Sequence, residues 1–147
     1  MTAAQVIAAM STEVYDMKVL LTLYGEERGP QDFTPEQGAA EIAAWQAFDE
    51  AARDAGVLLA CEGLAQSHTA TTVRIDGGGR QVTDGPFMET KEQLGGFIFL
   101  EVRDLDEALQ WAERTPWNHD GCYTEIRPIM DYAAWEAEAA SAERASS

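Results

Sequence analysis

Short apolar runs separated by turn-forming residues predict that much of this chain forms β-strands. Three runs have the length and the content of β-branched and large apolar side chains that are typical of buried strands: residues 18–24, 57–64 and 97–102. Residues 69–76 alternate between polar and β-branched side chains, and the glycines that follow allow a tight turn because glycine adopts positive φ without steric cost. We therefore expect a hairpin in which residues 81–83 return as a short strand, and a last strand over residues 122–129.

A first helix is predicted after Thr34. The Thr34 side chain can accept a hydrogen bond from the Gln37 N–H while the Gln37 side chain reaches back, and Pro35 at the first helical position gives up only a donor that would be unpaired. Gly56 is placed to end this helix. Its apolar positions share one stripe, which we expect to face the core: Ile42, Trp45, Phe48 and Ala52.

A second helix is predicted after Asp104. The Asp104 side chain can cap the first turn, Glu107 completes a variant of the capping box, and Pro116 stops the helix. We expect its buried face to consist of four apolar residues: Leu105, Ala108, Leu109 and Ala112.

The order strand, helix, strand, strand, helix, strand predicts an α+β protein with a ferredoxin-like βαββαβ unit in two layers. Both helices then cover one face of the sheet and leave the other open. That face would carry alternate residues of the strands, such as Val19 and Leu21 or Phe97 and Phe99, which are too apolar for a wide contact with water. We therefore expect a homodimer in which two sheets face each other, a dimeric α/β-barrel with a cleft inside.

The chain divides into one domain and two terminal segments. Residues 1–16 are expected to be a poorly ordered N-terminal extension, and Met17 could equally be the natural start. Residues 17–130 form the domain, which ends with the last predicted strand. The Ala- and Glu-rich tail, residues 131–147, could form a helix with Tyr132 and Trp135 docked on the domain.

The charge balance excludes several partners. Ten Lys and Arg residues stand against 26 Asp and Glu residues, for a net charge of -16. This balance argues against nucleic acid, whose phosphates are bound by cations, and against an anionic membrane surface. Cys61 and Cys122 belong to no metal-binding spacing, so we expect reduced thiols in a cytoplasmic protein without a metal site or cofactor.

Residues 82–97, which read VTDGPFMETKEQLGGF, carry a specific resemblance to a known protein family. With TATTVR, LDEALQWA and EIRP elsewhere in the chain, this string resembles the DGPF-domain type of the YciI-related (YCII) family, over about residues 17–130. The resemblance implies a ferredoxin-like fold that dimerises as an α/β-barrel. It also implies a functional link to an extracytoplasmic-function (ECF) sigma factor, beside which such proteins are often encoded.

The resemblance also bears on chemistry. Members of the wider family use a His/Asp pair in acid–base or dehalogenating reactions on small ring compounds, and the family aspartate is similar in position to Asp84. The histidine expected soon after the first strand has no counterpart, because that segment reads TLYGEERG.

Asp84 and His68 are the candidate catalytic residues. Asp84 could exchange protons with a substrate, or its side chain could simply accept N–H bonds in the turn before Gly85 and Pro86. His68 precedes the predicted hairpin, which could bring it to Asp84 as a substitute dyad; an exposed loop histidine is the alternative.

Four further residues are candidates for ligand binding: Tyr24, Glu89, Lys91 and Arg127. Glu89 and Lys91 could hold a polar ligand or form a solvated loop. Arg127, which shares a strand face with Glu125, could bind a carboxylate through two N–H donors, or both residues could form structural ion pairs with neighbouring strands. The Tyr24 hydroxyl could point into the cleft or anchor the end of the first strand.

Three functions follow from these residues. The first is a binding module that holds a small molecule in a dimer-associated cleft, with a regulatory role linked to an ECF sigma factor. The alternative is a cofactor-independent enzyme in which Asp84 performs acid–base chemistry, of isomerase or lyase type, on a small cyclic compound. The third is an interaction protein without a pocket.

Overall fold

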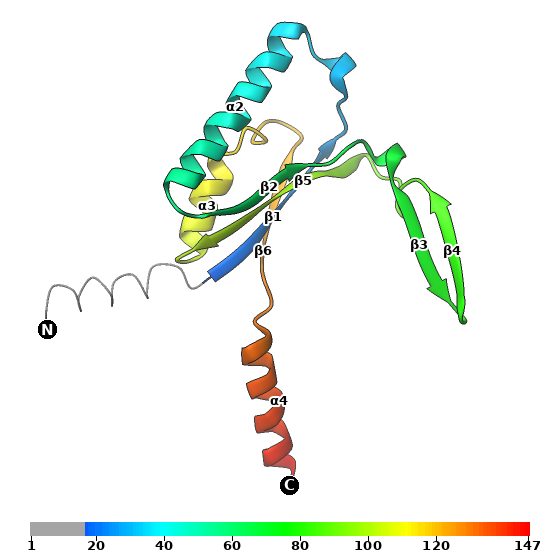
Figure 1. Cartoon of the computed structure of the whole chain (residues 1–147), viewed down its shortest axis with the longest axis vertical. Coiled ribbons are helices and arrows are strands. Elements are labelled where there is room, and N and C mark those ends of the chain that lie inside the picture. The colour runs from blue at the N-terminus through cyan, green and yellow to red at the C-terminus, as the bar shows by residue number, and fades with distance from the viewer. Residues whose placement is uncertain (1–16) are drawn as a thin grey trace, which may run out of the picture.

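The computed structural model describes residues 17–147, so the predicted N-terminal extension lies outside the described residues. The protein is an α+β domain built on a four-stranded antiparallel sheet with the strand order β2-β5-β1-β6. These strands are β1 (Met17–Glu26), β2 (Leu58–Gly63), β5 (Glu92–Val102) and β6 (Tyr123–Pro128). The helices α2 (Pro35–Asp54) and α3 (Leu105–Arg114) lie on the same side of this sheet (Figure 1).

The predicted βαββαβ order is present. The predicted hairpin, β3 (Thr71–Asp76) and β4 (Gly79–Asp84), forms as a separate two-stranded sheet between β2 and β5 in the chain. Two short 3-10 turns, η1 (Pro30–Asp32) and η2 (Ser67–Thr69), lie in the connections. Strand β5 begins earlier than expected, so that residues 92–94 and the two glycines after them belong to the strand.

The core lies between the sheet and the two helices. Alternate residues of β1 and β5 are fully buried on this side, including Leu21, Ile98 and Leu100. Phe48 of α2 meets Trp111 of α3 edge-on, with ring centroids 6.0 Å apart. The aromatic pair therefore joins the two helices above the strands.

Helix α2 begins as predicted. The Gln37 N–H donates to Thr34 Oγ1 at 3.1 Å, and the Thr34 N–H donates to Gln37 Oε1 at 2.9 Å, which completes the capping box. Phe48 and Ala52 are buried, but the expectation for Ile42 is wrong, because 61% of this residue is exposed. The N-terminal half of the helix stands away from the sheet, and Ile42 borders the space beneath it.

Helix α3 is capped by Asp104, whose Oδ1 accepts from the Glu107 N–H at 2.9 Å. The predicted capping box is wrong, because the Glu107 carboxylate pairs with Arg103 instead. The buried face of α3 also differs from the predicted one: Leu105 and Leu109 are exposed, whereas Trp111 is buried with Ala108. The indole of Trp111 fills the space against Phe48, which turns this side of the helix inward.

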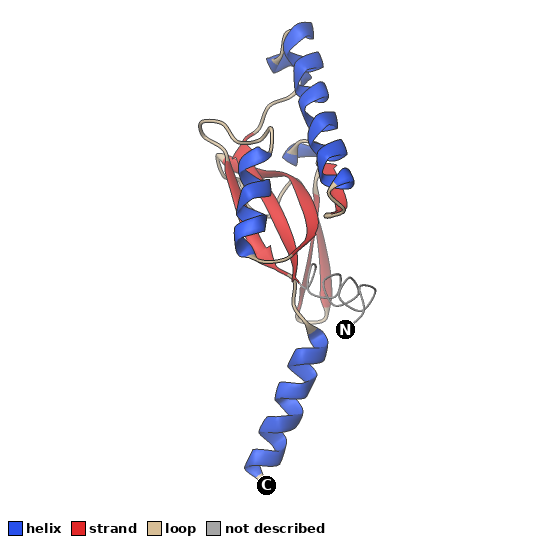
Figure 2. Cartoon of the chain, turned by 90° about the vertical axis from the view of Figure 1, so that its left-hand side faces the viewer, coloured by secondary structure: helices blue, strands red, loops and turns tan. Residues whose placement is uncertain are grey.

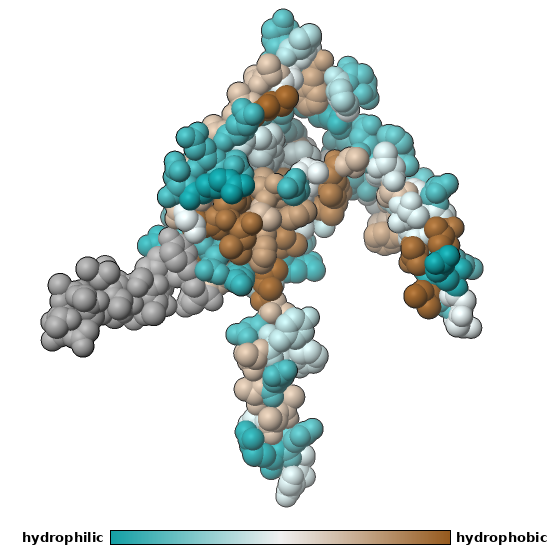
Figure 3. All heavy atoms as spheres, in the orientation of Figure 1, coloured by the Kyte–Doolittle hydropathy of each residue, from teal (hydrophilic) through white to brown (hydrophobic). Residues whose placement is uncertain are grey.

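Two parts of the chain project from the domain (Figure 1). The β3–β4 hairpin extends away from the sheet, and its apolar side chains are exposed (Figure 3): Val73, Ile75 and Val82. Helix α4 (Tyr132–Ser146) forms in the tail as expected and points away from the sheet (Figure 2). The expectation that Tyr132 and Trp135 dock on the domain is wrong for this chain, since both are more than half exposed.

No helix within residues 17–147 covers the second face of the sheet. Val19 and Leu21 are fully buried on the helix side. Phe97 and Phe99 alternate with the buried Ile98 and Leu100, so they lie on the open face, where they are half-buried. None of the helices in residues 17–147 has both the length and the apolar character needed to cross a membrane.

Candidate functional site

A cavity of about 540 Å³ lies between α2 and the adjacent ends of β1, β2 and β5. We call it the α2 cavity. Its apolar wall comes from four elements of the fold and includes Leu23, Ile42, Trp45, Gly95 and Trp117. Cavities of this size accommodate small organic molecules, and an apolar lining with a few polar groups is typical of binding sites.

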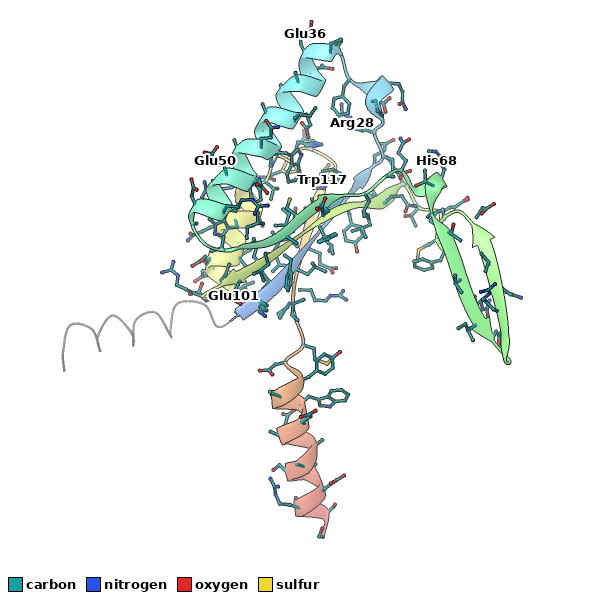
Figure 4. The ribbon with its side chains drawn as sticks, viewed as in Figure 1. Arg28, Glu36, Glu50, His68, Glu101 and Trp117 are labelled. Carbon is teal, nitrogen blue, oxygen red and sulfur yellow. The ribbon has the colours of Figure 1, made fainter. Side chains whose placement is uncertain are left out.

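Trp117 forms one wall of the α2 cavity and lies between α2 and the strands (Figure 4). Its Nε1–H donates to the carbonyl oxygen of Tyr24 at 3.0 Å, which holds the ring across the end of β1. The ring passes so close to Gly95 that a Cβ there would lie 2.7 Å from Cη2 of Trp117. Gly95 is therefore needed for the ring to reach this position.

Gly96 has a different neighbour. A Cβ at Gly96 would lie 2.7 Å from the carbonyl oxygen of Glu62, in the adjacent strand β2. Paired glycines in a strand indicate that something approaches the backbone closely, a ligand or a second chain being the usual expectation. Here both close approaches are made by the chain itself.

The charged residues that line the α2 cavity are acidic. Glu41 and Asp49 line it from α2, Glu62 borders it from β2, and none of the described residues in its lining is Lys, Arg or His; Gln46 adds a neutral amide. Because Glu62 pairs in register with Phe97, its side chain lies on the open face of the sheet. Glu41 Oε1 accepts from the Trp45 Nε1–H at 3.2 Å, and Asp49 Oδ2 pairs with Arg53 Nε at 2.6 Å. Glu41 and Glu62 take part in none of the ion pairs within residues 17–147.

The pKa of the Cys61 thiol is affected by the electrostatic environment of this cavity. Burial raises the pKa of its thiol, and the negative charges of Asp49 and Glu62 raise it further, whereas the positive charge of Arg53 has a smaller, opposite effect. The thiol therefore stays protonated at neutral pH and is a poor nucleophile. It contributes an apolar surface to the wall.

The candidate catalytic residues lie elsewhere. His68, Asp84 and Glu89 line one open hollow of about 370 Å³ at the base of the β3–β4 hairpin. Figure 4 shows His68 where the chain leaves β2 for this hairpin. All three residues are exposed, and within the described residues no hydrogen bond joins His68 to Asp84.

The turn after β4 does not depend on the Asp84 side chain. The Gly85 N–H donates to the carbonyl oxygen of Ala70 at 2.7 Å, and Thr72 Oγ1 donates to the Gly85 carbonyl oxygen at 2.8 Å. These two bonds attach the turn to the start of β3. The Asp84 carboxylate is left at the surface of the hollow, beside His68 and Glu89.

The other predicted ligand-binding residues are dispersed. Lys91 borders a polar hollow with Glu27, Arg28 and His119. Tyr24 borders a third, more open hollow beside Tyr123. Arg127 Nη2 pairs with Glu125 Oε1 at 3.0 Å, an ion pair within β6 and not one with a neighbouring strand.

The residues of the α2 cavity were missed by sequence reasoning, which assigns Trp45 to the core. A signal was present: Glu41, Trp45 and Asp49 follow one another at intervals of four, so they share one face of α2. Whether that face meets a packed core or a cavity depends on residues far away in the chain. Within residues 17–147, no three His, Cys, Asp or Glu side chains are arranged to hold a metal ion.

Comparison with known proteins gives one family. The sequence model of the YCII-related domain matches residues 17–133. An uncharacterised protein of Rhizobium meliloti (strain 1021) is 39% identical over 84 residues, which cover 56% of this chain and 68% of that protein.

Proposed function

The chain belongs to the YCII-related family, and we propose that it binds an apolar small molecule in the α2 cavity. The observation that carries this proposal is a cavity of about 540 Å³ with two tryptophans, Trp45 and Trp117, in its wall. Aromatic rings provide a large contact area for an organic ligand.

The walls of the α2 cavity are held in place before any ligand binds. Trp117 is fixed by its bond to Tyr24, and Trp45 packs edge-on against the buried Phe48 with ring centroids 5.9 Å apart. A preformed site avoids part of the ordering cost that weakens binding. The expectation from the sequence was a cleft between two paired sheets, whereas this cavity lies within one chain.

Filling the cavity should abolish this binding. A Cβ added to Gly63, which borders the cavity, meets no atom within 4 Å, so a side chain can begin there without a clash, and Gly63→Leu adds apolar volume at the cavity wall. We expect the uncharged, fluorescent N-phenyl-1-naphthylamine to bind at one site per chain, and Gly63→Leu to weaken its binding by roughly tenfold, about 1.4 kcal/mol. Fluorescence titration measures both values.

The matched control is Gly38→Leu. Gly38 lies in the first turns of α2, outside the cavity, and a Cβ there also meets no atom within 4 Å. This variant should bind the probe as the unmodified protein does. Equal affinity of all three proteins, or no saturable binding, would contradict the proposal.

We further propose that two chains associate through the open face of the sheet. Leu20, Phe97 and Phe99 are half-buried on that face, and none of the described helices covers them. At micromolar concentration, light scattering should give twice the mass of the chain, and Phe99→Glu should give the mass of one chain. Leu105→Glu makes the same change on α3, on the helix side of the sheet, and should leave the dimer intact; a monomeric unmodified protein would contradict the proposal.

Acid–base catalysis by Asp84 is the second candidate function. It is favoured by the common position of His68, Asp84 and Glu89 in one hollow, where a small ring compound could contact all three side chains. The hollow is open, and its groups are exposed, so it provides little of the desolvation that tunes catalytic carboxylates. The link to a sigma factor rests on the family resemblance alone.

A further inference from the structure

We infer that the ligand of the α2 cavity is an organic cation, an amine or quaternary ammonium compound with an apolar body. This inference rests on the proposed function and adds the charge of the ligand to it. Three features of the cavity are consistent with it: its carboxylates, its tryptophans and, as a consequence of the carboxylates, the environment of its thiol.

The carboxylates are the first feature. Of the two carboxylates that α2 contributes to the lining, only Asp49 has a cationic partner, the guanidinium of Arg53. Glu41 forms no ion pair within the described residues. Glu62 borders the cavity from β2, but it pairs in register with Phe97, so its side chain lies on the open face of the sheet. A cation beside Glu41 gains attraction, whereas an anion is repelled.

The tryptophans are the second feature. The Trp45 Nε1–H already donates to Glu41, and the Trp117 Nε1–H already donates to Tyr24. Each indole has only this one donor, so neither ring can offer a hydrogen bond to an anionic ligand. Both rings still present their π-surfaces, and the negative potential above an indole attracts ammonium groups.

The thiol of Cys61 is the third feature. Burial is the largest cause that raises the pKa of this group, and the charges of Asp49 and Glu62 raise it further, by more than the charge of Arg53 lowers it. The field at the cavity wall is therefore negative even though a guanidinium lies nearby. A ligand with a positive charge compensates this field, and an apolar body fills the space that water would otherwise occupy.

Three probes of similar size test the sign of the charge: phenethyltrimethylammonium, its uncharged isostere (3,3-dimethylbutyl)benzene and the anion 3-phenylpropionate. Each is titrated against the full-length protein, and displacement of N-phenyl-1-naphthylamine gives its affinity. We expect the cation to bind at least roughly tenfold more tightly than the uncharged isostere, and the anion to bind most weakly. Added salt should weaken the binding of the cation and not that of the other two probes.

A variant with the unpaired carboxylate of the cavity neutralised, Glu41→Gln, should remove most of the preference for the cation and leave the binding of the uncharged isostere unaffected. The amide introduced in place of the Glu41 carboxylate keeps an oxygen that can accept from Trp45. The matched control is Glu50→Gln, which removes the same charge from a position of α2 that does not line the cavity (Figure 4). The control should keep the preference.

The outcomes separate the two proposals. Equal affinity for the cation and its uncharged isostere, or tighter binding of the anion, overturns the inference about charge and leaves the cavity as an apolar site. The same loss in the control variant shows that net charge of the protein, and not the cavity, attracts the cation, which also overturns the inference. If neither these probes nor N-phenyl-1-naphthylamine binds, the proposed function itself is wrong.

Discussion

Replacing Gly96 by alanine is expected to lower the free energy of unfolding by about 3 kcal/mol, because the new methyl group has no space. The added Cβ would lie 2.7 Å from the carbonyl oxygen of Glu62 and 3.3 Å from the Cα of Gly63. Both atoms belong to the backbone of β2, so the clash is relieved only if β2 moves away from β5 and weakens their pairing. Urea unfolding of the two proteins measures the difference.

The residue opposite Gly96 supplies the matched control. Gly63 pairs with Gly96 in the register of β2 and β5, yet a Cβ at Gly63 meets no atom within 4 Å. Gly63→Ala should therefore change the free energy of unfolding by less than about 1 kcal/mol, with a stabilising contribution from the reduced freedom of the unfolded chain. If both variants lost a similar free energy of unfolding, the close approach at Gly96 would not be the cause of the destabilisation.

Replacing Gly95 by alanine should lower the free energy of unfolding by about 2 kcal/mol, and the size of this loss should depend on Trp117. The added Cβ would lie 2.7 Å from Cη2 of Trp117, a ring that its bond to Tyr24 prevents from turning away. Trp117→Ala alone should destabilise the protein by about 3 kcal/mol, since it removes a half-buried ring and a hydrogen bond. It should also weaken the binding of N-phenyl-1-naphthylamine.

The double variant distinguishes steric contact from other effects. Once Trp117 is replaced by alanine, Gly95→Ala should lower the free energy of unfolding by less than about 0.5 kcal/mol. The effects of the two substitutions on stability are then far from additive. Chemical unfolding of the four proteins of this cycle gives the interaction free energy. Additive costs would mean that Gly95 is required for the conformation of β5 and not for the position of Trp117.

Signals that act over a few residues were sufficient to predict most elements. The capping box of Thr34 and Gln37 forms within one turn and does not depend on the rest of the fold, so α2 begins where the sequence predicts. The same holds for the hairpin. Its glycine turn joins β3 to β4, and this local geometry is enough to bring His68 and Asp84 to one hollow.

The orientation of the second helix could not be obtained in this way. The spacing of apolar residues in α3 allows more than one buried face, and the helix turns the largest of them, Trp111, towards Phe48. The buried face of α3 is therefore selected by Phe48, a ring that belongs to α2. A pattern within α3 holds no information about it, which is why Leu105 and Leu109 were assigned to the wrong side.

By itself, the sequence determined the class of the fold, the starts of the helices, the order of the strands and the family, because each depends on local hydrogen bonds, on alternation or on a short specific string. Only the tertiary structure decided where a ligand could bind. The α2 cavity brings together Leu23, Glu41, Cys61, Gly95 and Trp117, which lie far apart in the chain. Its shape follows from how a helix, three strand ends and one indole ring share the same space, and packing of that kind is a property of the folded chain as a whole.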